Sequence, residues 1–204
     1  MRKLALLAVT AACLFTTPVF ANEFAAPLQA QAEAAKAWLG DAIIIDSLKA
    51  QNTAHGNLTQ ADIDTLDKQW RAETTAAEQP LIQKVLGNPL SAYLKQKQAA
   101  SNGLYAEIFV MDSKGLNAGQ SAITSDYWQG DEDKWLKTFS AGANAIHLGD
   151  VEQDESTQAF QSQLSLPIVD PASGAVIGAI TIGINVEALE PPLACSIARP
   201  RIAG

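Results

Sequence analysis

The chain changes its hydrophobic period near residue 104, and this change limits the folds that are open to it. Before this point apolar residues recur at the spacing of an amphipathic helix, and after it they alternate as in a strand with one buried face. Helices followed by strands in a chain of 204 residues indicate an α+β fold. We therefore expect a helical region over residues 22–103 and a sheet domain over residues 104–189.

The helical region opens with a segment that predicts one long helix over residues 26–52. Pro27 lies near its first turn, and Gly40 is a weak point in its middle. An apolar stripe at helical spacing is made by Leu28, Ala32, Ala35, Leu39, Ala42 and Ile43. This stripe either covers the sheet or pairs with a second copy of the chain, and the sequence leaves both open.

Three shorter helices are predicted from their end signals. Thr59 and Asp62 have the spacing of a capping box at the start of one helix. Proline at the start and glycine past the end mark two more, over residues 80–86 and from residue 89 to just before residue 103.

The second half of the chain predicts five strands, joined largely by tight turns. They cover residues 104–111, 116–123, 145–151, 160–170 and 175–186. The turns "DSKG" and "DPASG" join the first two and the last two strands, so we expect an antiparallel sheet. In the fourth strand, glutamines and a serine alternate with the face expected to be buried, which is made by Phe160, Ser162, Leu164, Leu166 and Ile168. Pro167 indicates an edge or a bulge there.

The first 21 residues predict a secretory signal peptide. Arg2 and Lys3 precede the apolar run "LALLAVTAACLFT", and the small residues Val19 and Ala21 close the segment "VFA". The apolar run is shorter than the roughly 20 residues that span a bilayer. We expect cleavage after Ala21 and a periplasmic protein, with a lipoprotein anchored at Cys13 as the alternative.

The charge of the chain excludes one class of partner. Removal of residues 1–21 takes away two of the 14 Lys and Arg, so that 12 stand against 22 Asp and Glu, a formal net charge of −10. An acidic chain of this kind lacks the electrostatic footprint of a nucleic-acid-binding protein. The mature chain would keep a single cysteine, Cys195, in an irregular tail over residues 190–204, so no intramolecular disulfide can form.

The candidate ligand site is the segment "TSDYWQGDEDKW", residues 124–135. It lies between the second strand and a predicted short helix, and it holds two of the four tryptophans and four carboxylates. Aromatic faces attract an ammonium group, and a carboxylate adds a charge-assisted hydrogen bond. The residues expected to contact a ligand here are Ser121, Asp126, Tyr127, Trp128, Asp131 and Trp135.

Structural roles compete for some of these residues. Asp131 is also placed to cap a short helix over residues 131–141. Trp135 would share the buried side of that helix with Leu136 and Phe139. The segment is therefore either the mouth of a ligand site or a polar connector that leads into a helix.

The sequence argues against catalysis and against a metal site. His55 and His147 are the only histidines, and no nucleophile-elbow, P-loop or dinucleotide-binding pattern accompanies them. Two isolated histidines without nearby cysteines make a poor zinc site. We expect His55 to lie in a solvated loop and His147 in a strand, and we expect no enzyme, no metal and no cofactor.

Two stretches resemble the extracytoplasmic PAS-like sensor domains of the Cache, or PDC, type. They are "LYAEIFVMDSKGLNAGQSAITSDYWQGDEDKW", residues 104–135, and "LSLPIVDPASGAVIGAITIGINVEAL", residues 164–189. The first resembles the opening hairpin and the loop that closes the pocket, and the second resembles the last hairpin. With the long helix included, the resemblance covers roughly residues 25–189 and implies a five-stranded antiparallel PAS-like sheet that binds a small molecule between sheet and loop.

The resemblance implies a sensory domain for a small metabolite, with an amine or an amino acid favoured. Receptors of this family continue into a transmembrane helix, whereas this chain ends fifteen residues after Leu189 without an apolar span. We therefore expect it to act through a partner, with a membrane sensor kinase, a chemoreceptor or a transporter as candidates. The alternative is a non-catalytic protein-interaction module with a degenerate pocket, and a weak homodimer through the helix of Ala35 and Ile43 is a further hypothesis.

Overall fold

The computed structural model describes residues 24–153 and 160–189. The expected signal peptide, its cleavage site after Ala21 and the alternative anchor at Cys13 lie outside the described residues, and so does the tail with Cys195.

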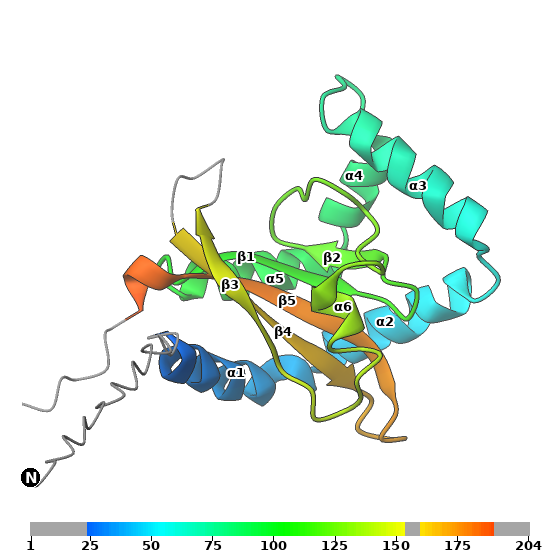
Figure 1. The fold of residues 1–204 in the computed structure, drawn as a ribbon. Coiled ribbons are helices and arrows are strands. Elements are labelled where there is room, and N and C mark those ends of the chain that lie inside the picture. The colour runs from blue at the N-terminus through cyan, green and yellow to red at the C-terminus, as the bar shows by residue number, and fades with distance from the viewer. Residues whose placement is uncertain (1–23, 154–159, 190–204) are drawn as a thin grey trace, which may run out of the picture.

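Helices come first along the chain, and two strands, a short helix and three strands follow (Figure 1). The described helices are α1 Ala25–Leu39, α2 Ala42–His55, α3 Gln60–Glu73, α4 Pro80–Leu86, α5 Pro89–Ala100 and α6 Asp133–Leu136. The strands are β1 Tyr105–Met111, β2 Asn117–Gln120, β3 His147–Gln153, β4 Phe160–Val169 and β5 Val176–Asn185, followed by the 3₁₀ turn η1 Val186–Ala188. The expected α+β fold is confirmed.

The five strands form one antiparallel sheet in the order β2-β1-β5-β4-β3, which is a PAS-like arrangement. Pairing between β3 and β4 stops at His147 opposite Ser165, so Pro167 lies past the end of β3 on that side. Its missing N–H therefore removes no bond from the β3–β4 ladder, although β4 is an inner strand and not the edge strand that was one of the two expectations.

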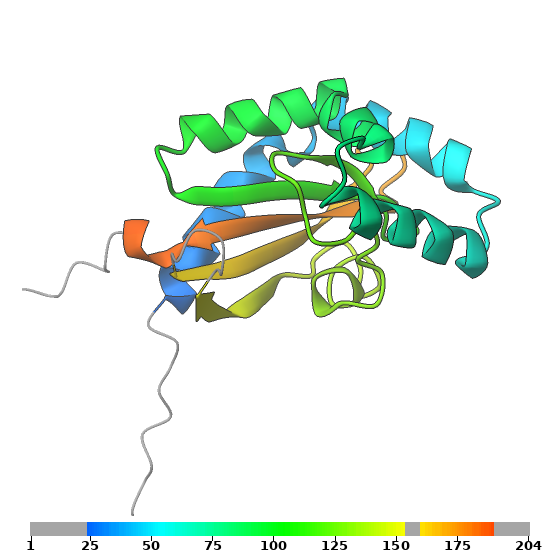
Figure 2. The same ribbon diagram turned by 90° about the horizontal axis from the view of Figure 1, so that it is seen from above.

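Helices α1, α2 and α5 cover one face of the sheet, as the view from above shows (Figure 2). The main core lies between them and includes Leu28, Ala32, Ala35, Leu48, Leu94, Ile108, Val110, Leu164, Leu166, Ile180 and Ile182. Alternation along the strands directs these residues to the helices, because successive side chains point to opposite faces. Residues of the opposite parity are thereby left for the second face of the sheet.

Two smaller clusters complete the core. On the second face of the sheet, Trp135 and Phe139 stack with their ring centroids 4.7 Å apart and pack against Phe109 and Met111. A separate cluster joins α3 and α4 to the segment after β2 and includes Ile63, Trp70, Ile82, Val85, Leu116 and Tyr127. This second cluster anchors the loop that the sequence singles out.

The segment predicted as one long helix is two helices. The chain leaves helical geometry at Asp41, which has an extended backbone with φ −60° and ψ 136° and is the N-cap of α2. Its side chain accepts a hydrogen bond from the Tyr93 hydroxyl on α5. The break also changes the helical phase: Ala42 is exposed and Ile43 half-buried, so the predicted stripe holds only over α1, while Ile44, Ile45 and Leu48 face the core in α2.

Several end signals are confirmed and some are wrong. The capping box of Thr59 and Asp62 is present, and α4 and α5 begin at their prolines. The expected cap at Asp131 is wrong, because α6 is a single short turn whose N-cap is Glu132. Leu136 is 43% exposed rather than buried, since so short a helix has no continuous apolar side.

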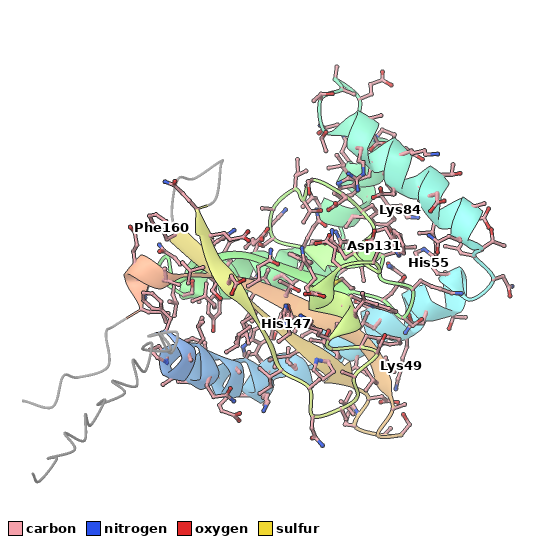
Figure 3. The ribbon with its side chains drawn as sticks, in the orientation of Figure 1. Lys49, His55, Lys84, Asp131, His147 and Phe160 are labelled. Atoms are coloured by element: carbon pink, nitrogen blue, oxygen red, sulfur yellow. The ribbon has the colours of Figure 1, made fainter. Side chains whose placement is uncertain are left out.

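Two strand expectations also need correction. The strand that returns after the first turn is only four residues long, Asn117–Gln120, instead of eight. Phe160, expected on the buried side of its strand, lies at the outer end of β4 and is 44% exposed (Figure 3).

Candidate functional site

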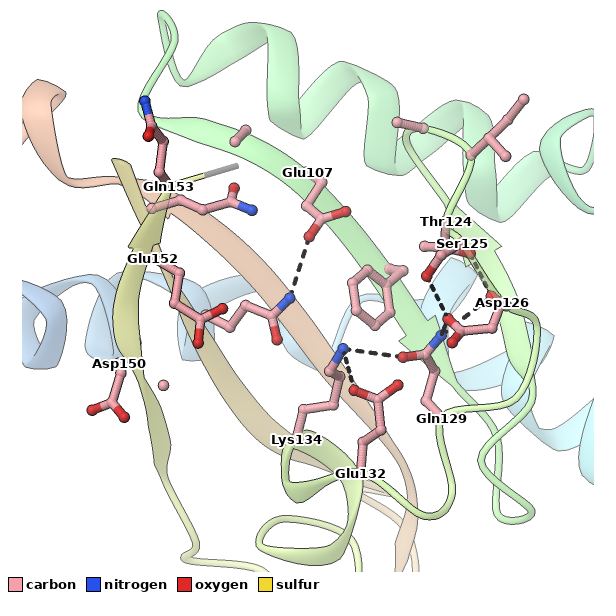
Figure 4. A pocket seen from close by; sticks show the side chains of 17 residues that line it. Glu107, Thr124, Ser125, Asp126, Gln129, Glu132, Lys134, Asp150, Glu152 and Gln153 are labelled. Atoms are coloured by element: carbon pink, nitrogen blue, oxygen red, sulfur yellow. Dashed lines mark hydrogen bonds and ion pairs between the residues drawn. The ribbon is translucent and has the colours of Figure 1, made fainter. Parts of the chain in front are cut away.

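A groove of about 780 Å³ lies on the second face of the sheet, between the strands and the loop that precedes α6 (Figure 4). Strands β1, β3 and β4 form one wall, and residues 122–134 form the other. The sheet side is lined by Ala106, Glu107, Phe109, Gly149, Asp150, Glu152, Gln153, Gln161 and Gln163. The loop side is lined by Ala122, Ile123, Thr124, Ser125, Asp126, Gln129, Glu132 and Lys134.

Strand alternation supplies the sheet wall. Because Ile108 and Val110 point into the core beneath the helices, Glu107 and Phe109 on the same strand point to the groove. Gly183 of β5 lies between Glu107 and Gln163 in the sheet, and a Cβ there would meet the Glu107 side chain at 2.8 Å. The absence of a side chain at this position lets the neighbouring polar side chains close over β5.

The lining of the groove is strongly acidic. Five carboxylates are present, from Glu107, Asp126, Glu132, Asp150 and Glu152, against one cation, Lys134. Four glutamines, a serine and a threonine add neutral hydrogen-bonding groups, and Phe109 supplies an aromatic face. Carboxylates with an aromatic face and few cations suit a ligand that carries a positive charge.

Helix α3 holds the loop wall in place. The indole Nε1 of Trp70 donates to the Thr124 carbonyl oxygen at 2.8 Å, and the Trp70 ring stacks on Tyr127 with centroids 5.3 Å apart. One carboxylate oxygen of Asp67 accepts from the backbone N–H groups of Tyr127 and Trp128 at 2.9 and 3.1 Å. A helix far away in sequence therefore positions the segment 124–128.

Asp126 faces the groove, as the sequence predicts, and its carboxylate already has partners. Oδ2 pairs with Arg71 Nη2 at 3.1 Å, and Oδ1 accepts from Gln129 Nε2 at 2.7 Å and from the Ser125 hydroxyl. A hydrogen bond from Arg71 to Asp67, with the charge of Asp126 as a smaller contribution, raises the pKa of Arg71. Arg71, Gln129 and Ser125 therefore fix the Asp126 carboxylate at one end of the groove.

The polar chain continues from Asp126 to the floor of the groove. Gln129 is 1% exposed, and its Oε1 accepts a hydrogen bond from Lys134 Nζ at 3.1 Å. Lys134 Nζ also pairs with Glu132 at 2.9 Å and lies 5.4 Å from the centre of the Phe109 ring. Figure 4 shows Lys134 between Glu132 and Gln129.

Two of the expected ligand contacts, Ser121 and Tyr127, are buried beside the groove and are not among its lining residues. The Ser121 hydroxyl accepts a hydrogen bond from the Ile108 N–H at 2.8 Å and so extends the pairing of β1 with the segment after β2. Tyr127 is 4% exposed, and burial raises the pKa of its hydroxyl, with the charge of Asp112 as a smaller contribution. Contact of these residues with a ligand stays a prediction.

The remaining three candidates also lie outside the lining. The Trp128 indole donates to the Lys114 carbonyl oxygen at 2.8 Å and fits against two glycines, Gly115 and Gly130. The Trp135 indole donates to the Asp112 carbonyl oxygen at 3.2 Å and stacks on Phe139, and Asp131 is exposed ahead of α6 (Figure 3). A ligand role for these three likewise stays a prediction.

Sequence reasoning missed the sheet side of the site. Glu107, Gln161 and Gln163 line the groove, but the alternating pattern was used only to find the apolar face. The signal was present, because polar residues that alternate with a buried apolar set must face a second surface. Because a loop was expected to cover that surface, the polar residues of the strands could have been named as candidates.

His55 is not in a solvated loop, so that expectation is wrong. It is the last residue of α2, and its Nδ1 lies 2.7 Å from Oδ2 of Asp112, which is fully buried. Asp112 also accepts from the Lys114 and Leu116 N–H groups and from the Gln51 amide. His55 therefore joins the end of α2 to the β1–β2 turn.

Two absences apply to the described parts of the chain. Within residues 24–153 and 160–189, no helix is long and apolar enough to cross a membrane. Over the same residues, no three side chains of His, Cys, Asp or Glu are grouped so that they could hold a metal ion.

Comparison with known proteins gives likenesses of fold. No protein-family model matches the chain, and no curated protein matches its sequence. Similar solved structures include the sensor domain of the V. cholerae histidine kinase DctB, with a TM-score of 0.48 and 14% identity over 82% of this chain and 52% of that one. The ligand-binding domain of the Campylobacter jejuni chemoreceptor Tlp3 with L-valine has a TM-score of 0.40 and 16% identity, over 81% of this chain and 65% of that one.

A third similar structure is the ligand-binding domain of the Pseudomonas aeruginosa amino acid chemoreceptor PctC with GABA. Its TM-score is 0.40 at 13% identity, over 79% of this chain and 62% of that one. The chain thus spans between about half and two thirds of the length of these three domains. All three are sensor or ligand-binding domains.

Proposed function

We propose that this protein is a periplasmic sensory domain that binds a small metabolite with an ammonium group, such as an amine or an amino acid. Binding takes place in the groove between the sheet and residues 122–134. The protein passes the signal to a partner, for which a membrane sensor kinase, a chemoreceptor or a transporter are the candidates. Its periplasmic location rests on the expected signal peptide, residues 1–21.

The observation that carries the proposal is the composition of the groove. Five carboxylates and one lysine line it, and the buried Phe109 ring, 2% exposed, forms part of its floor. The volume of about 780 Å³ is in the range of small-molecule sites, about 300–1,000 Å³. An ammonium group would gain contacts here with both the carboxylates and the ring.

Catalysis is not part of the proposal. The groove lining contains no histidine or cysteine among the described residues, and its hydroxyl groups belong to Thr124 and Ser125. The Thr124 hydroxyl donates to the Asp126 carbonyl oxygen at 2.6 Å and is thus held within the loop. Neither hydroxyl is paired with a histidine of the kind that activates a nucleophile in the usual triads.

The interaction module with a degenerate pocket remains the second candidate. A degenerate pocket would be a hydrophobic groove without oriented polar groups. In this groove Asp126, Gln129 and Lys134 are each held by hydrogen bonds. The ordered polar lining therefore favours ligand binding over a degenerate pocket.

A thermal-shift screen of the mature protein against a metabolite library tests the proposal. L-Valine and GABA belong in the library, because two of the similar structures hold them. A ligand at a hundredfold excess over its dissociation constant stabilises a protein by about 2.7 kcal/mol. We expect at least one compound with an ammonium group to raise the melting temperature, and a screen without any shift would favour the interaction module.

Matched variants locate the binding. Asp126→Asn and Glu107→Gln each remove one groove carboxylate, and each should weaken a cationic ligand by roughly tenfold to a hundredfold, the loss of about 1.5–3 kcal/mol for a charged hydrogen bond. Glu33→Gln is the control, because Glu33 is exposed on α1 and pairs with Lys36. Equal affinities in all three variants would place the ligand outside the groove.

A further inference from the structure

Lys134 is set apart from the other residues of the groove by its charge and its position. It is the one cation among the lining residues that the structure describes, and its side chain is 14% exposed. The nearby Lys137 follows the more common pattern: its side chain is 56% exposed and pairs with Asp133 at 2.7 Å. A lysine that turns into an acidic groove rather than toward solvent calls for a specific role.

The surroundings of Lys134 Nζ are those of a binding site for an ammonium group. A carboxylate oxygen of Glu132 lies at 2.9 Å, the amide oxygen of Gln129 at 3.1 Å, and the centre of the Phe109 ring at 5.4 Å. Charge, hydrogen-bond acceptor and aromatic face are the three elements that recognise an alkylammonium ion. Gln129 is itself oriented by Asp126, which its amide nitrogen contacts at 2.7 Å.

We infer that Lys134 is a tethered occupant of the cation subsite, so that a ligand must displace its ammonium group to bind over Phe109. This inference rests on the proposed binding function of the groove and adds a selectivity device to it. When a simple amine displaces Lys134, one ammonium group replaces another in the subsite, so the gain in binding free energy is small. A ligand with additional groups that bind the surrounding carboxylates and amides gains enough binding free energy to displace Lys134.

The position of Lys134 permits this exchange. It lies on α6, a helix of only four residues, and both Glu132 and Asp133 beside it are partly exposed, with side-chain exposures of 38% and 62%. A lysine has a flexible four-carbon stem, so its ammonium group can leave the groove for solvent without a backbone rearrangement. Departure of the lysine also returns a −1 charge to the subsite, which attracts the incoming cation.

Binding of n-butylammonium to the mature protein and to Lys134→Met tests the inference by isothermal titration calorimetry. Methionine keeps the apolar length of the side chain and removes the charge, so the vacant subsite should bind the probe at least about tenfold more tightly than the wild type. Lys137→Met is the matched control, because it removes the same charge from the same segment outside the groove. The control should bind n-butylammonium with an affinity within about twofold of that of the wild type, since exposed charges are screened by salt.

A second variant and a second measurement keep the inference testable if Lys134→Met does not fold. Lys134→Gln should show the same gain if Lys134→Met does not fold. In the unmodified protein, acetic anhydride should label Lys134 more slowly than Lys137, because Lys134 Nζ is held by Glu132 and Gln129. Equal labelling rates would overturn the inference.

Two binding results would also overturn it. Unchanged affinity for n-butylammonium would mean that Lys134 does not occupy the subsite, and weaker binding would make Lys134 a contact of the ligand rather than its competitor. Failure here is distinct from failure of the proposed function: a metabolite can bind the groove without this exchange, and Lys134→Met can bind the probe in a protein with no natural ligand.

Discussion

Trp70 connects the helical region to the groove at the scale of a single residue. It is fully buried, donates to the Thr124 carbonyl oxygen at 2.8 Å and stacks on Tyr127. Trp70→Phe keeps an aromatic ring and leaves that buried oxygen without the indole donor. We expect a loss of about 1–3 kcal/mol in the free energy of unfolding, measured by urea denaturation.

Trp38→Phe is the control for this change. Trp38 is half-buried on α1, where it packs against the margin of the main core beside Lys97 and Tyr93. We expect Trp38→Phe to lower the free energy of unfolding by less than Trp70→Phe does. If the two variants lose equal stability, the hydrogen bond to Thr124 does not hold the loop wall.

A second prediction at this scale concerns pH. Burial, with the charge of Lys137 as a smaller contribution, lowers the pKa of His147 from its ordinary value of 6.5. The unfolded chain therefore binds a proton at a higher pH than the folded chain, and the free energy of unfolding falls as pH drops from about 6.5 through the lowered pKa.

His147→Gln removes this titration. Urea denaturation at pH 7.5 and at pH 5.5 should show a smaller loss of stability in the variant than in the wild type. The charged groups that act on His147 are Lys137, Asp133, Asp150 and Lys134. An identical loss in both proteins would mean that His147 is not the source of the pH dependence.

Single residues of the site were predicted only in part, and the reason is physical. The prediction that a loop carboxylate faces the groove holds for Asp126 but not for Asp131, because Arg71 and Gln129 orient Asp126 through contacts that the local sequence does not show. Tyr127 and Trp128 could not be assigned, because an aromatic ring serves a core as well as a binding site. Trp70 and Asp67 decide their positions from about 60 residues away, and local sequence carries no record of such contacts.

At the scale of elements, close packing between α2 and β5 fixes the helices on the sheet. A Cβ on Gly178 would lie 2.4 Å from the Met111 carbonyl oxygen and 2.9 Å from Leu48 Cδ1. Gly178→Ala should therefore lower the free energy of unfolding by about 1–3 kcal/mol, because neither the strand nor the helix can shift freely. Thermal and urea denaturation measure the effect.

Gly40→Ala is the matched control. Nothing lies within 4 Å of a Cβ at Gly40, and its φ of −85° suits any residue. Alanine there restricts the unfolded chain, so we expect stabilisation by about 0.4–1 kcal/mol. If Gly178→Ala is as harmless as Gly40→Ala, α2 does not pack on β5 at this distance.

Helices and strands were predicted where local signals act alone. The capping box at Thr59 and the prolines at 80 and 89 define helix starts through their own backbone geometry. Gly40 marked a weak point in the predicted long helix, but local sequence did not show that the chain breaks there, where the Asp41 side chain is held by Tyr93, 52 residues later. The shortness of β2 likewise follows from how the loop after it folds back, since the Asn117 N–H bonds to Tyr127.

At the scale of the whole molecule, the weak homodimer stays a prediction. The part of the apolar stripe that lies on α1 is buried, so a smaller surface is left for pairing with a second copy. Ala32 and Ala35 are fully buried against the sheet, so the stripe on α1 covers the core of its own chain. Ala42 remains exposed at the start of α2. If the dimer uses this surface, Ala42→Glu should make the protein monomeric without loss of stability, because an acidic residue suits the first turn of a helix.

Light scattering over a range of protein concentrations measures the mean molecular mass and thus the extent of dimer formation. The unmodified protein should increase in mean mass with concentration, and Ala42→Glu should not. A monomer at every concentration in the unmodified protein would remove the dimer hypothesis and leave the binding function untouched.

The order of the strands is a property of the whole chain. Hairpins predicted which neighbours pair, β1 with β2 and β4 with β5, but nothing local brings β1 next to β5 in the middle of the sheet. That pairing joins residues 105–111 to residues 179–184, and it forms the floor from which Glu107 and Phe109 reach the groove.

The central claim is that the groove binds a small cationic molecule over Phe109. The most direct test is a crystal structure of the mature protein with the compound that gives the largest thermal shift. We expect the ammonium group of that compound near Phe109, Glu132 and Gln129, with Lys134 displaced toward solvent. A ligand bound at any other surface, with the groove unchanged, would contradict it.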